Sequence, residues 1–389
     1  MQGEAMIYLD NAATTLRKPE GVKTAMIRAL EEAGNPGRGA YGASLNASRI
    51  LFRASEAAAE LLGTEDPERI AFTQNVTESL NAAVSALPQM VRRKEPFRII
   101  TTRTEHNSVL RPLYRLEKEG KASLTFWEPE PDGRLDPVRL PQLLTSETAA
   151  MVITHASNVT GRITDLTAAA AFARENGILL VVDGAQALGA VPVNVERDGI
   201  DIYCFTGHKG LYGPQGTGGI YVRAGLAVRP LLMGGSGIHS FDRDMPREMP
   251  AVLEAGTRNT PGIAGLEAGI RFVLETGPER ILKHERTLAG CFVRRIREIP
   301  NLKLYGYRDM EGTGIVSLNL GEEDAAVVAD RLWEEAGICV RAGAHCAPLM
   351  HEFFGTKEQG IVRFSFSAFN TEEEAEQAAD ALKNIAETM

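Results

Sequence analysis

The sequence predicts an α/β fold, with a large domain built on a mostly parallel seven-stranded sheet and a smaller α+β domain towards the carboxyl terminus. Two observations predict it. Short β-rich runs alternate with helix-length segments from residue 69 to residue 222, and long helical patterns replace them beyond residue 260. The 389 residues are enough for two domains with a large core.

Seven runs are expected to form the strands of the large sheet, with helices on both of its faces. They are RIAFT at 69–73, RIITT at 98–102, SLTFW at 123–127, AMVITH at 150–155, ILLVVD at 178–183, IDIYCF at 200–205 and GGIYV at 218–222. Before them, YLDNAATT at 8–15 and GNPGRGAYG at 34–42 have the composition of loops. Residues 46–62 place apolar side chains at helical spacing and predict a helix with one buried face.

The pattern changes beyond Thr260-Pro261-Gly262. Long helices are expected at about 261–275 and 279–298, followed by the strands GIVSLNL and IVRFSFS and by an acidic helix from Thr371. We expect a large domain at residues 16–260 and a small domain that combines residues 1–15 with 261–389.

Composition and charge narrow the range of partners. The formal net charge is −9, and no block of basic residues occurs. Nucleic acids and anionic membranes are bound through clusters of lysine and arginine, so neither is expected as a partner. The amino terminus has no basic region, and no segment approaches the roughly 18 apolar residues of a membrane span. We expect a cytoplasmic protein that acts on small molecules or proteins.

The four cysteines are Cys204, Cys291, Cys339 and Cys346. They are too few and too scattered for a disulfide framework, and they form no CxxC pair, so no metal site is expected. Cys204 lies in an apolar run and Cys291 in a helical pattern, which predicts that both are core residues. Cys346 stands apart from them.

Polar side chains follow five of the predicted strands, at the edge where open α/β sheets bind their ligands. They are Thr73, Gln74 and Asn75, then Glu105, His106 and Asn107, then Ser157 and Asn158, then Asp183 and Gln186, and finally Thr206 to Lys209. Five strand ends therefore converge on one predicted site.

Lys209 is the centre of that site. It follows the apolar run IDIYCF and the turn Thr206-Gly207-His208, and a glycine-rich stretch comes after it. A lysine at a strand end, with a hydroxyl and an imidazole before it, is typical of an amine that forms a Schiff base beside a phosphate. The alternative is a solvated surface lysine.

Asp183 directly follows the buried run ILLVV. A buried carboxylate needs a cationic partner, and the protonated ring nitrogen of pyridoxal phosphate is one; the alternative is a cap on the next helix. Residues 73–78, TQNVTE, have the form of a helix start and could bind a phosphate, with donors from Thr206 and His208; a plain N-cap is the alternative. His106 could stack on a flat ring or move a proton, although many such histidines are structural.

Cys346 and Arg363 suggest chemistry in the second half of the chain. Cys346 lies beside a histidine in RAGAHCAP at 341–348, which predicts a short exposed loop that could present a nucleophilic thiolate. A buried cysteine at a strand end is the alternative. Arg363, among apolar residues in IVRFSFS, needs an anion, which could be a substrate carboxylate or an intramolecular salt-bridge partner.

Seven motifs carry a resemblance to a known family. They are YLDNAATT at 8–15, EHNS at 105–108, SNVTG at 157–161, DGAQ at 183–186, TGHK at 206–209, EAGTRNT at 254–260 and RAGAHCAP at 341–348. Together they resemble the class V aminotransferase family of pyridoxal-phosphate enzymes, of fold type I. Within it the chain is similar to cysteine desulfurases and selenocysteine lyases, and its short cysteine loop resembles the group II (SufS-like) branch.

The resemblance implies a role for each site residue. Lys209 would form the imine with pyridoxal 5′-phosphate, Asp183 would pair with the ring nitrogen, and His106 would stack on the ring and act in acid/base catalysis. The remaining cofactor contacts would come from Gln186, Asn158, Val76, Thr77, Thr206 and His208, with Thr257 reaching the phosphate from the second subunit of a homodimer. Arg363, with Asn158 and Ala13, would bind the substrate, and Cys346 would accept sulfur.

Two positions depart from the group II pattern, because Ala344 and Tyr41 stand where histidines are common. The resulting hypothesis is a cysteine desulfurase that converts L-cysteine to L-alanine, carries the sulfur as a Cys346 persulfide and passes it to an acceptor protein. Iron–sulfur clusters, thiolated RNA and cofactors are all compatible destinations. The alternatives are a selenocysteine lyase, an aminotransferase or β-lyase for a small amino acid, and a non-catalytic cofactor-binding protein.

Overall fold

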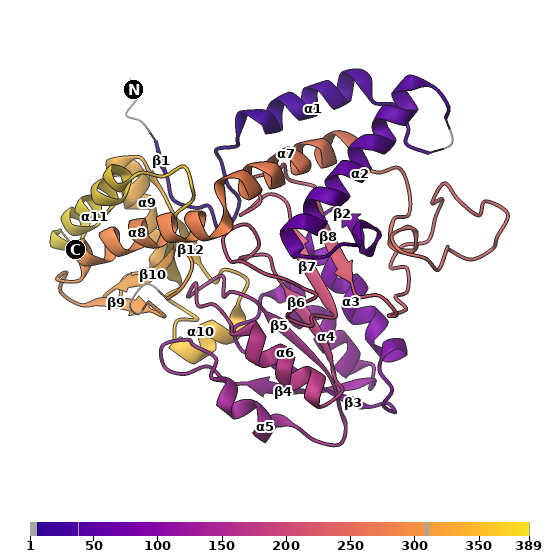
Figure 1. The fold of residues 1–389 in the computed structure, drawn as a ribbon. Coiled ribbons are helices and arrows are strands. Elements are labelled where there is room, and N and C mark those ends of the chain that lie inside the picture. Colours follow the sequence, from indigo (N-terminus) through magenta and orange to yellow (C-terminus); the bar gives the residue numbers. More distant parts are fainter. Residues whose placement is uncertain (1–5, 38, 308–310, 389) are drawn as a thin grey trace.

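The computed structural model describes residues 6–37, 39–307 and 311–388. Its largest element is a seven-stranded sheet with the order β2-β8-β7-β6-β5-β3-β4 (Figure 1). The strands are β2 Ile70–Thr73, β3 Phe97–Thr102, β4 Ala122–Trp127, β5 Thr148–Thr154, β6 Leu179–Asp183, β7 Ile202–Thr206 and β8 Gly218–Val222. Strand β8 runs antiparallel to both neighbours, and the other neighbouring pairs are parallel. All seven predicted strands and the predicted fold are confirmed.

Helices cover both faces of this sheet because successive strand side chains point to opposite faces. The helices are α1 Glu20–Glu32, α2 Gly42–Leu62, α3 Val76–Met90, α4 Asn107–Lys118, α5 Leu140–Leu143, α6 Leu166–Glu175 and α7 Thr260–Thr276. Val181 lies in a core with α3 and α4, whereas its neighbour Val182 lies in a core with α2, α6 and α7. Cys204 is buried within β7, as the sequence predicts.

A four-stranded antiparallel sheet, with the order β12-β13-β10-β9, forms the centre of the carboxyl-terminal part. Its strands are β9 Leu302–Tyr305, β10 Ile315–Leu320, β12 Arg341–Gly343 and β13 Ile361–Ser365, and the helices around it are α8 Pro278–Ile296, α9 Ala325–Ala336, α10 Pro348–Phe354 and α11 Glu372–Glu387. Phe292 of α8 packs on Phe364 of β13 with ring centroids 4.5 Å apart. These elements gather at one end of the molecule (Figure 1). The predicted strands and the final helix are confirmed.

The amino-terminal segment links this end to the large sheet. Strand β1 (Ile7–Tyr8) pairs in parallel with β11 (Ile338–Cys339), so the predicted loop at 8–15 begins in a strand. Further along, Thr15 donates from its backbone N to His208 O at 3.0 Å. One short segment therefore touches both the carboxyl-terminal part and the end of β7.

The division into domains stays a prediction. Leu266 of α7 and Leu282 near the start of α8 belong to the core of the large sheet, whereas Leu288, further along α8, belongs to the core of the second sheet. We therefore propose that the change of core falls within α8 rather than near residue 260. Within the described residues, no helix is both long enough and apolar enough to cross a membrane.

Candidate active site

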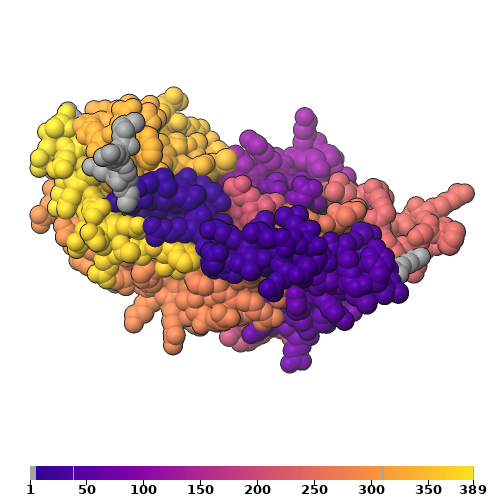
Figure 2. All heavy atoms as spheres, turned by 90° about the horizontal axis from the view of Figure 1, so that it is seen from above, coloured from indigo at the N-terminus to yellow at the C-terminus, as the bar shows by residue number. Residues whose placement is uncertain are grey.

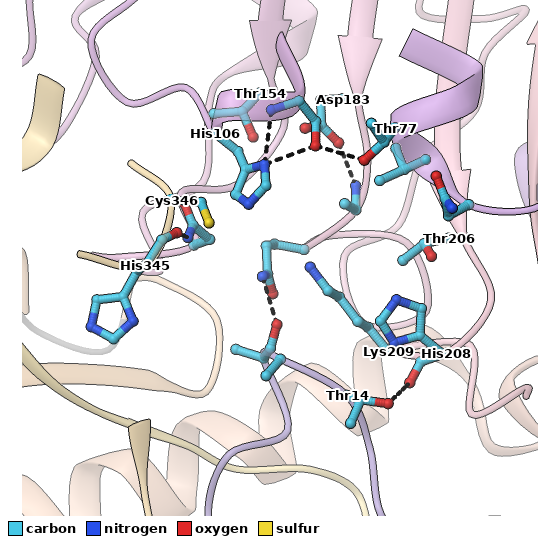
Figure 3. A pocket seen from close by; sticks show the side chains of 18 of the residues that line it. Thr14, Thr77, His106, Thr154, Asp183, Thr206, His208, Lys209, His345 and Cys346 are labelled. Atoms are coloured by element: carbon cyan, nitrogen blue, oxygen red, sulfur yellow. Dashed lines mark hydrogen bonds between the residues drawn. The ribbon is translucent and has the colours of Figure 1, made fainter. Parts of the chain in front are cut away.

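A pocket of about 540 Å³ opens at the carboxyl ends of β5, β6 and β7 (Figure 3). Parallel strands end at the same edge of a sheet, which brings residues from distant parts of the chain together there. Twelve of the thirteen residues predicted for the site line this pocket: Ala13, Val76, Thr77, His106, Asn158, Asp183, Gln186, Thr206, His208, Lys209, Cys346 and Arg363. The thirteenth, Thr257, lines a separate cavity with Phe72, Thr73 and Gly216.

Lys209 and Asp183 place opposite charges in the pocket. Asp183 ends β6 and accepts a hydrogen bond from Ala185 N at 2.9 Å, whereas Lys209 Nζ has neither a hydrogen bond nor an ion pair within the described residues. Burial raises the pKa of Asp183, against the Ala185 N–H and the charge of Lys209. Burial lowers the pKa of Lys209 to about 8, against the charge of Asp183. Near pH 8 about half of the amines are therefore neutral, and a neutral amine is a nucleophile and a base.

His106 is held as a neutral imidazole at the start of α4. Its Nδ1 accepts from Ser108 N at 3.0 Å, which places the ring proton on Nε2. Burial lowers the pKa of His106 to about 4, with smaller contributions from the charges of Lys209 and Arg363. Ser108 Oγ lies 2.9 Å from Nδ1 and 2.8 Å from Thr77 Oγ1, so the ring is fixed to α3 as well as to its own helix.

The amino-terminal end of α3 forms one wall of the pocket. Asn75 caps this helix, because its side chain accepts from Glu78 N at 3.0 Å. This cap and the predicted anion site are compatible, since one cap satisfies one of the free N–H groups in the first turn. In the same pocket, Thr206 Oγ1 and His208 Nδ1 are buried and lack a hydrogen-bond partner among the described residues. Buried polar atoms without partners are costly, and a polar ligand would satisfy these.

Asn158 and Gln186 connect the pocket to other segments. Asn158 donates from Nδ2 to His345 O at 2.7 Å, and its Oδ1 is buried without a partner among the described residues. Gln186 donates from Nε2 to Ala12 O at 2.9 Å. Both side-chain amides line the pocket, and their hydrogen bonds fix the segments that contain His345 and Ala12.

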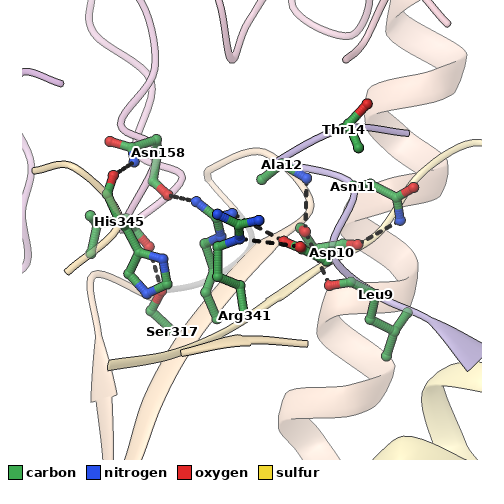
Figure 4. A network of polar contacts seen from close by, with 12 residues as sticks. Leu9, Asp10, Asn11, Ala12, Thr14, Asn158, Ser317, Arg341 and His345 are labelled. Carbon is green, nitrogen blue, oxygen red and sulfur yellow. Dashed lines mark hydrogen bonds and ion pairs between the residues drawn. The ribbon is translucent and has the colours of Figure 1, made fainter. Parts of the chain in front are cut away.

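Arg363 lines the pocket and forms an ion pair with Asp10, which Figure 4 shows beside Arg341. Its Nη2 is 3.2 Å from Asp10 Oδ1, and its Nη1 donates to Asn158 O at 2.9 Å. The other carboxylate oxygen of Asp10 accepts from Arg341 Nε at 3.2 Å. The sequence suggested either a substrate carboxylate or an intramolecular salt bridge as the partner of Arg363, and the structure contains the salt bridge, with Asp10. Two cations nevertheless share one carboxylate, so the network keeps one net positive charge beside the pocket.

Cys346 is exposed, in the turn between β12 and α10. His345 and Cys346 both adopt left-handed backbone conformations, with φ of 47° and 55°. Such conformations cost about 1–3 kcal/mol each in residues other than glycine and persist where surrounding contacts impose them. The contacts here are His345 Nε2 with Ile361 O at 2.9 Å and the bond from Asn107 N to Cys346 O at 2.7 Å.

A family model described as aminotransferase class-V matches residues 7–378, which is nearly the whole chain. The chain belongs to the class-V aminotransferase family. This confirms the resemblance that the motifs indicate, and the family uses pyridoxal phosphate. In this class-V aminotransferase family member, residues from six of the seven motifs line the pocket, and the seventh motif, EAGTRNT, lines the separate cavity.

Two relatives and two solved structures that are similar to this chain over nearly its whole length are named as cysteine desulfurases. A probable cysteine desulfurase of Methanothermobacter thermautotrophicus is 34% identical over 98% of this chain and 94% of its own length. A cysteine desulfurase of Serratia proteamaculans is 32% identical over 99% and 94%. The apo structure of the Thermococcus onnurineus NA1 cysteine desulfurase has a TM-score of 0.92 at 33% identity, covering 99% of this chain and 95% of the other. Escherichia coli CsdA has a TM-score of 0.89 at 29% identity, with the same coverage.

Several polar residues of this site were not predicted from the sequence. Asp10 and Arg341 lie in motifs that were singled out, and the need of Arg363 for an anion was the signal that could have found Asp10. His345 was noticed as a neighbour of Cys346, but its left-handed backbone has no sequence signal, because glycine is the usual residue there. Glu105 was noted at a strand end, and its burial was not foreseen.

Glu105, the residue before His106, is a fully buried carboxyl group. Its Oε1 accepts from Thr102 Oγ1 at 2.7 Å and from Thr154 N at 2.9 Å, and its Oε2 has no partner among the described residues. Burial raises the pKa of Glu105 to about 8, although both hydrogen bonds act to lower it. The folded protein therefore holds this group in its protonated form at neutral pH.

We predict that Glu105→Gln removes part of the pH dependence of folding. Because the pKa of Glu105 is higher in the folded chain than the ordinary 4.5, its stabilising effect is complete below about pH 4.5 and is lost as the pH rises through about 8. The free energy of unfolding of the wild type should therefore fall relative to that of the variant by on the order of 3 kcal/mol between pH 5 and pH 9. Urea unfolding of the cofactor-free proteins measures this.

Glu31→Gln, on an exposed face of α1, is the control and should leave the pH dependence unchanged. Glu285 also has a raised pKa of about 8, but it is present in every protein compared and cancels in the difference. A constant difference between wild type and Glu105→Gln at all pH values would show that Glu105 is ionised in the folded state.

Proposed function

We propose that this chain is a pyridoxal-phosphate-dependent cysteine desulfurase, which converts L-cysteine to L-alanine and leaves the sulfur on Cys346. One observation carries the proposal: the exposed thiol of Cys346 lines the same pocket as Lys209 and Asp183. A cofactor pocket alone would suit many reactions of the family. A free thiol within it suits one in which sulfur is accepted.

The residues of the pocket fit pyridoxal phosphate. Lys209 would hold its aldehyde carbon covalently, and Asp183 would pair with its ring nitrogen. The first turn of α3, together with the unpartnered Thr206 Oγ1 and His208 Nδ1, would accept the phosphate. When bound, this cofactor supplies an electron sink that stabilises negative charge at the substrate's α carbon. The rest of the chemistry belongs to the side chains.

Covalent attachment at Lys209 predicts a specific mass change. Borohydride reduction of the purified protein should fix the cofactor to the peptide that contains Lys209, and Lys209→Ala should abolish the modification. Thr206→Val, which removes a hydroxyl proposed to face the phosphate, should leave attachment at Lys209 and weaken cofactor retention by about tenfold, corresponding to one charge-assisted hydrogen bond. Peptide mass spectrometry and equilibrium dialysis measure these outcomes. Modification at another lysine would refute the assignment.

The arginine network supports binding of an amino-acid carboxylate. Arg363 is buried and its Nε has no partner among the described residues, so it retains a donor after it has bonded to Asp10 and Asn158. Burial lowers the pKa of Arg363 to about 10, with Asp10 opposing this, so the guanidinium stays charged at neutral pH. The net positive charge of the network would attract the substrate carboxylate to the wall of the pocket.

Two side chains would move the proton and the sulfur. Lys209, with its lowered pKa, would take the proton from the α carbon of L-cysteine. The Cys346 thiolate would then attack the substrate sulfur, forming an S–S bond while the carbon–sulfur bond breaks and its electron pair stays with the carbon fragment. Protonation of that fragment gives L-alanine. The thiol and L-cysteine together therefore yield a persulfide and L-alanine, without an external oxidant or reductant.

Cys346→Ala is expected to lower desulfuration of L-cysteine at least about 100-fold, because the sulfur acceptor is lost while the pocket is kept. The measurements are alanine release and the mass of the Cys346 peptide, which should gain one sulfur atom in the wild type. The retained spectral response of the variant to L-cysteine would show that binding is intact. Undiminished turnover in Cys346→Ala would instead favour a selenocysteine lyase or a β-lyase in which this thiol is structural.

Arg363→Gln is a complementary variant for the same assay. It removes the charge and keeps a polar side chain, so KM for L-cysteine should rise more than tenfold while the persulfide still forms at saturating substrate. Arg294→Gln, on an exposed face of α8, is the control.

The functional unit that we propose is a homodimer in which Thr257 reaches the phosphate site of the other subunit. In its own chain Thr257 lies outside the pocket. The segment before it projects from one end of the molecule, as Figures 1 and 2 show, and exposes the apolar side chains of Leu232, Met233, Ile238 and Phe241. Phe241 is completely exposed. Apolar side chains on a projecting segment are typical of a surface that another chain covers.

Sedimentation equilibrium should therefore give a mass near twice the 42.2 kDa of the chain. Phe241→Asp should weaken the association, because it places a charge in the proposed contact. Tyr114→Asp, at a partly exposed aromatic residue on α4, is the control and should leave the mass unchanged. A monomeric wild type at micromolar concentration would contradict the proposal.

A further inference from the structure

A second cavity begins at Cys346 and leads away from the pocket. It has a volume of about 380 Å³ and shares Thr77, His106, Ser108 and Cys346 with the pocket. Its outer part runs along α4 and is lined by Asn81, Asn107, Arg111, Pro112 and Arg115. We call this outer part the α4 groove. The thiol therefore lies where two cavities meet, and it can be approached from both.

The α4 groove carries positive charge. Arg111 and Arg115 are four residues apart, hence on the same side of α4, and both are exposed. Arg111 makes no ion pair within the described residues, and Arg115 has Glu119 at 3.9 Å. No acidic residue belongs to the lining of this groove in the described part of the chain. The chain as a whole has a net charge of −9, so the positive charge of the α4 groove is a local exception.

The charge of Arg111 also reaches the active site. After burial, Lys209 and Arg363, it is a further cause of the lowered pKa of His106. Asn107 ties the groove to the backbone of Cys346, because its backbone N donates to Cys346 O at 2.7 Å. An anion in the groove would therefore lie near the reacting sulfur while leaving the pocket free.

We propose that the α4 groove binds an acidic, cysteine-bearing segment of the protein that accepts sulfur from Cys346. This inference rests on the proposed function, since it assigns a partner to the persulfide. Carboxylates that flank the acceptor thiol would pair with Arg111 and Arg115, and the thiol would reach Cys346 at the inner end of the groove. The amino acid uses the pocket and the acceptor uses the groove, so the two reactants approach the same sulfur from different sides.

The transfer step is balanced without a further reagent. The acceptor thiolate attacks the outer sulfur of the Cys346 persulfide and forms a new S–S bond. The bond between that sulfur and Cys346 Sγ breaks, and its electron pair leaves with Sγ as the thiolate. The outcome is a persulfide on the acceptor and a restored Cys346 for the next molecule of L-cysteine.

Synthetic peptides test the proposal. The holoenzyme is loaded with L-cysteine and freed of excess substrate, and its persulfide content is measured by mass spectrometry. It is then mixed with capped pentapeptides that have a central cysteine flanked by two aspartates, two glycines or two lysines on each side. At low ionic strength, we expect Arg111→Glu to slow discharge by the aspartate peptide about fivefold or more and to leave discharge by the glycine peptide within about twofold.

Comparing wild type and variant for one peptide at a time cancels differences in thiol pKa among the peptides. Lys118→Glu is the matched control, because it reverses a charge on the same helix outside the groove. All three peptides should discharge the persulfide of this variant at the wild-type rate. Arg115→Glu serves as a second variant if Arg111→Glu does not fold, and it should show the same selectivity for the aspartate peptide. Added salt should weaken the preference of the wild type.

The outcomes separate this inference from the proposed function. If no persulfide forms in the wild type, the proposed function fails. The persulfide could form while the ratio of the two discharge rates, by the aspartate peptide and by the lysine peptide, is the same in Arg111→Glu and Arg115→Glu as in the wild type. In that case the groove does not select an acidic acceptor, and the inference is overturned. The inference would also be overturned if the lysine peptide discharged the wild-type persulfide faster than it discharged the persulfides of the two variants.

Discussion

Two opposite charges, placed at the ends of adjacent strands and withdrawn from water, are the constraint on which this site depends. Asp183 ends β6 and Lys209 follows β7, and the two strands pair directly. Burial favours the neutral form of each group, and the attraction between them favours the charged forms. The balance leaves an amine with a pKa of about 8 beside a carboxylate that still needs a cation. A cofactor that carries an aldehyde and a basic ring nitrogen could react with the amine through the aldehyde and pair with the carboxylate through the protonated nitrogen.

The amino-terminal segment brings the carboxyl-terminal part of the chain to this pair of charges. Asp10 holds Arg341 and Arg363 from two neighbouring strands, β12 and β13, while Ala12 accepts from Gln186 at the end of β6. The arginines and Cys346 come from the same end of the molecule, so this segment sets their distance from Lys209. Without Asp10, two guanidinium groups would lie close together without a carboxylate between them, which explains why an acid lies at the wall where we propose that a substrate carboxylate binds.

The fold was largely predictable from the sequence, because the strands are short apolar runs and the helices have one apolar face. The positions of Asp183 and Lys209 in the pocket were predictable for the same reason, because both follow directly from the end of a strand. Asp10 was not, since its partner lies more than 300 residues away and the segment around it has the composition of a plain loop. The groove beside Cys346 was not predictable either. From the sequence, Arg111 and Arg115 look like ordinary charges on a solvated helix face, and only the fold shows that an exposed thiol lies at the end of that face.

Cys346 is open to two cavities because of its backbone conformation. A thiol on a regular strand or helix would face either the pocket or solvent, whereas the left-handed turn at His345 and Cys346 places it at the meeting point of both cavities. That turn is costly by about 1–3 kcal/mol per residue, and three hydrogen bonds from separate elements, through Asn158, Ile361 and Asn107, hold it. Two of these partners belong to the large sheet's loops and helices and one to β13. The position of the sulfur is therefore a property of both parts of the molecule, and a change in how they pack would move the thiol relative to the amine and to the α4 groove together.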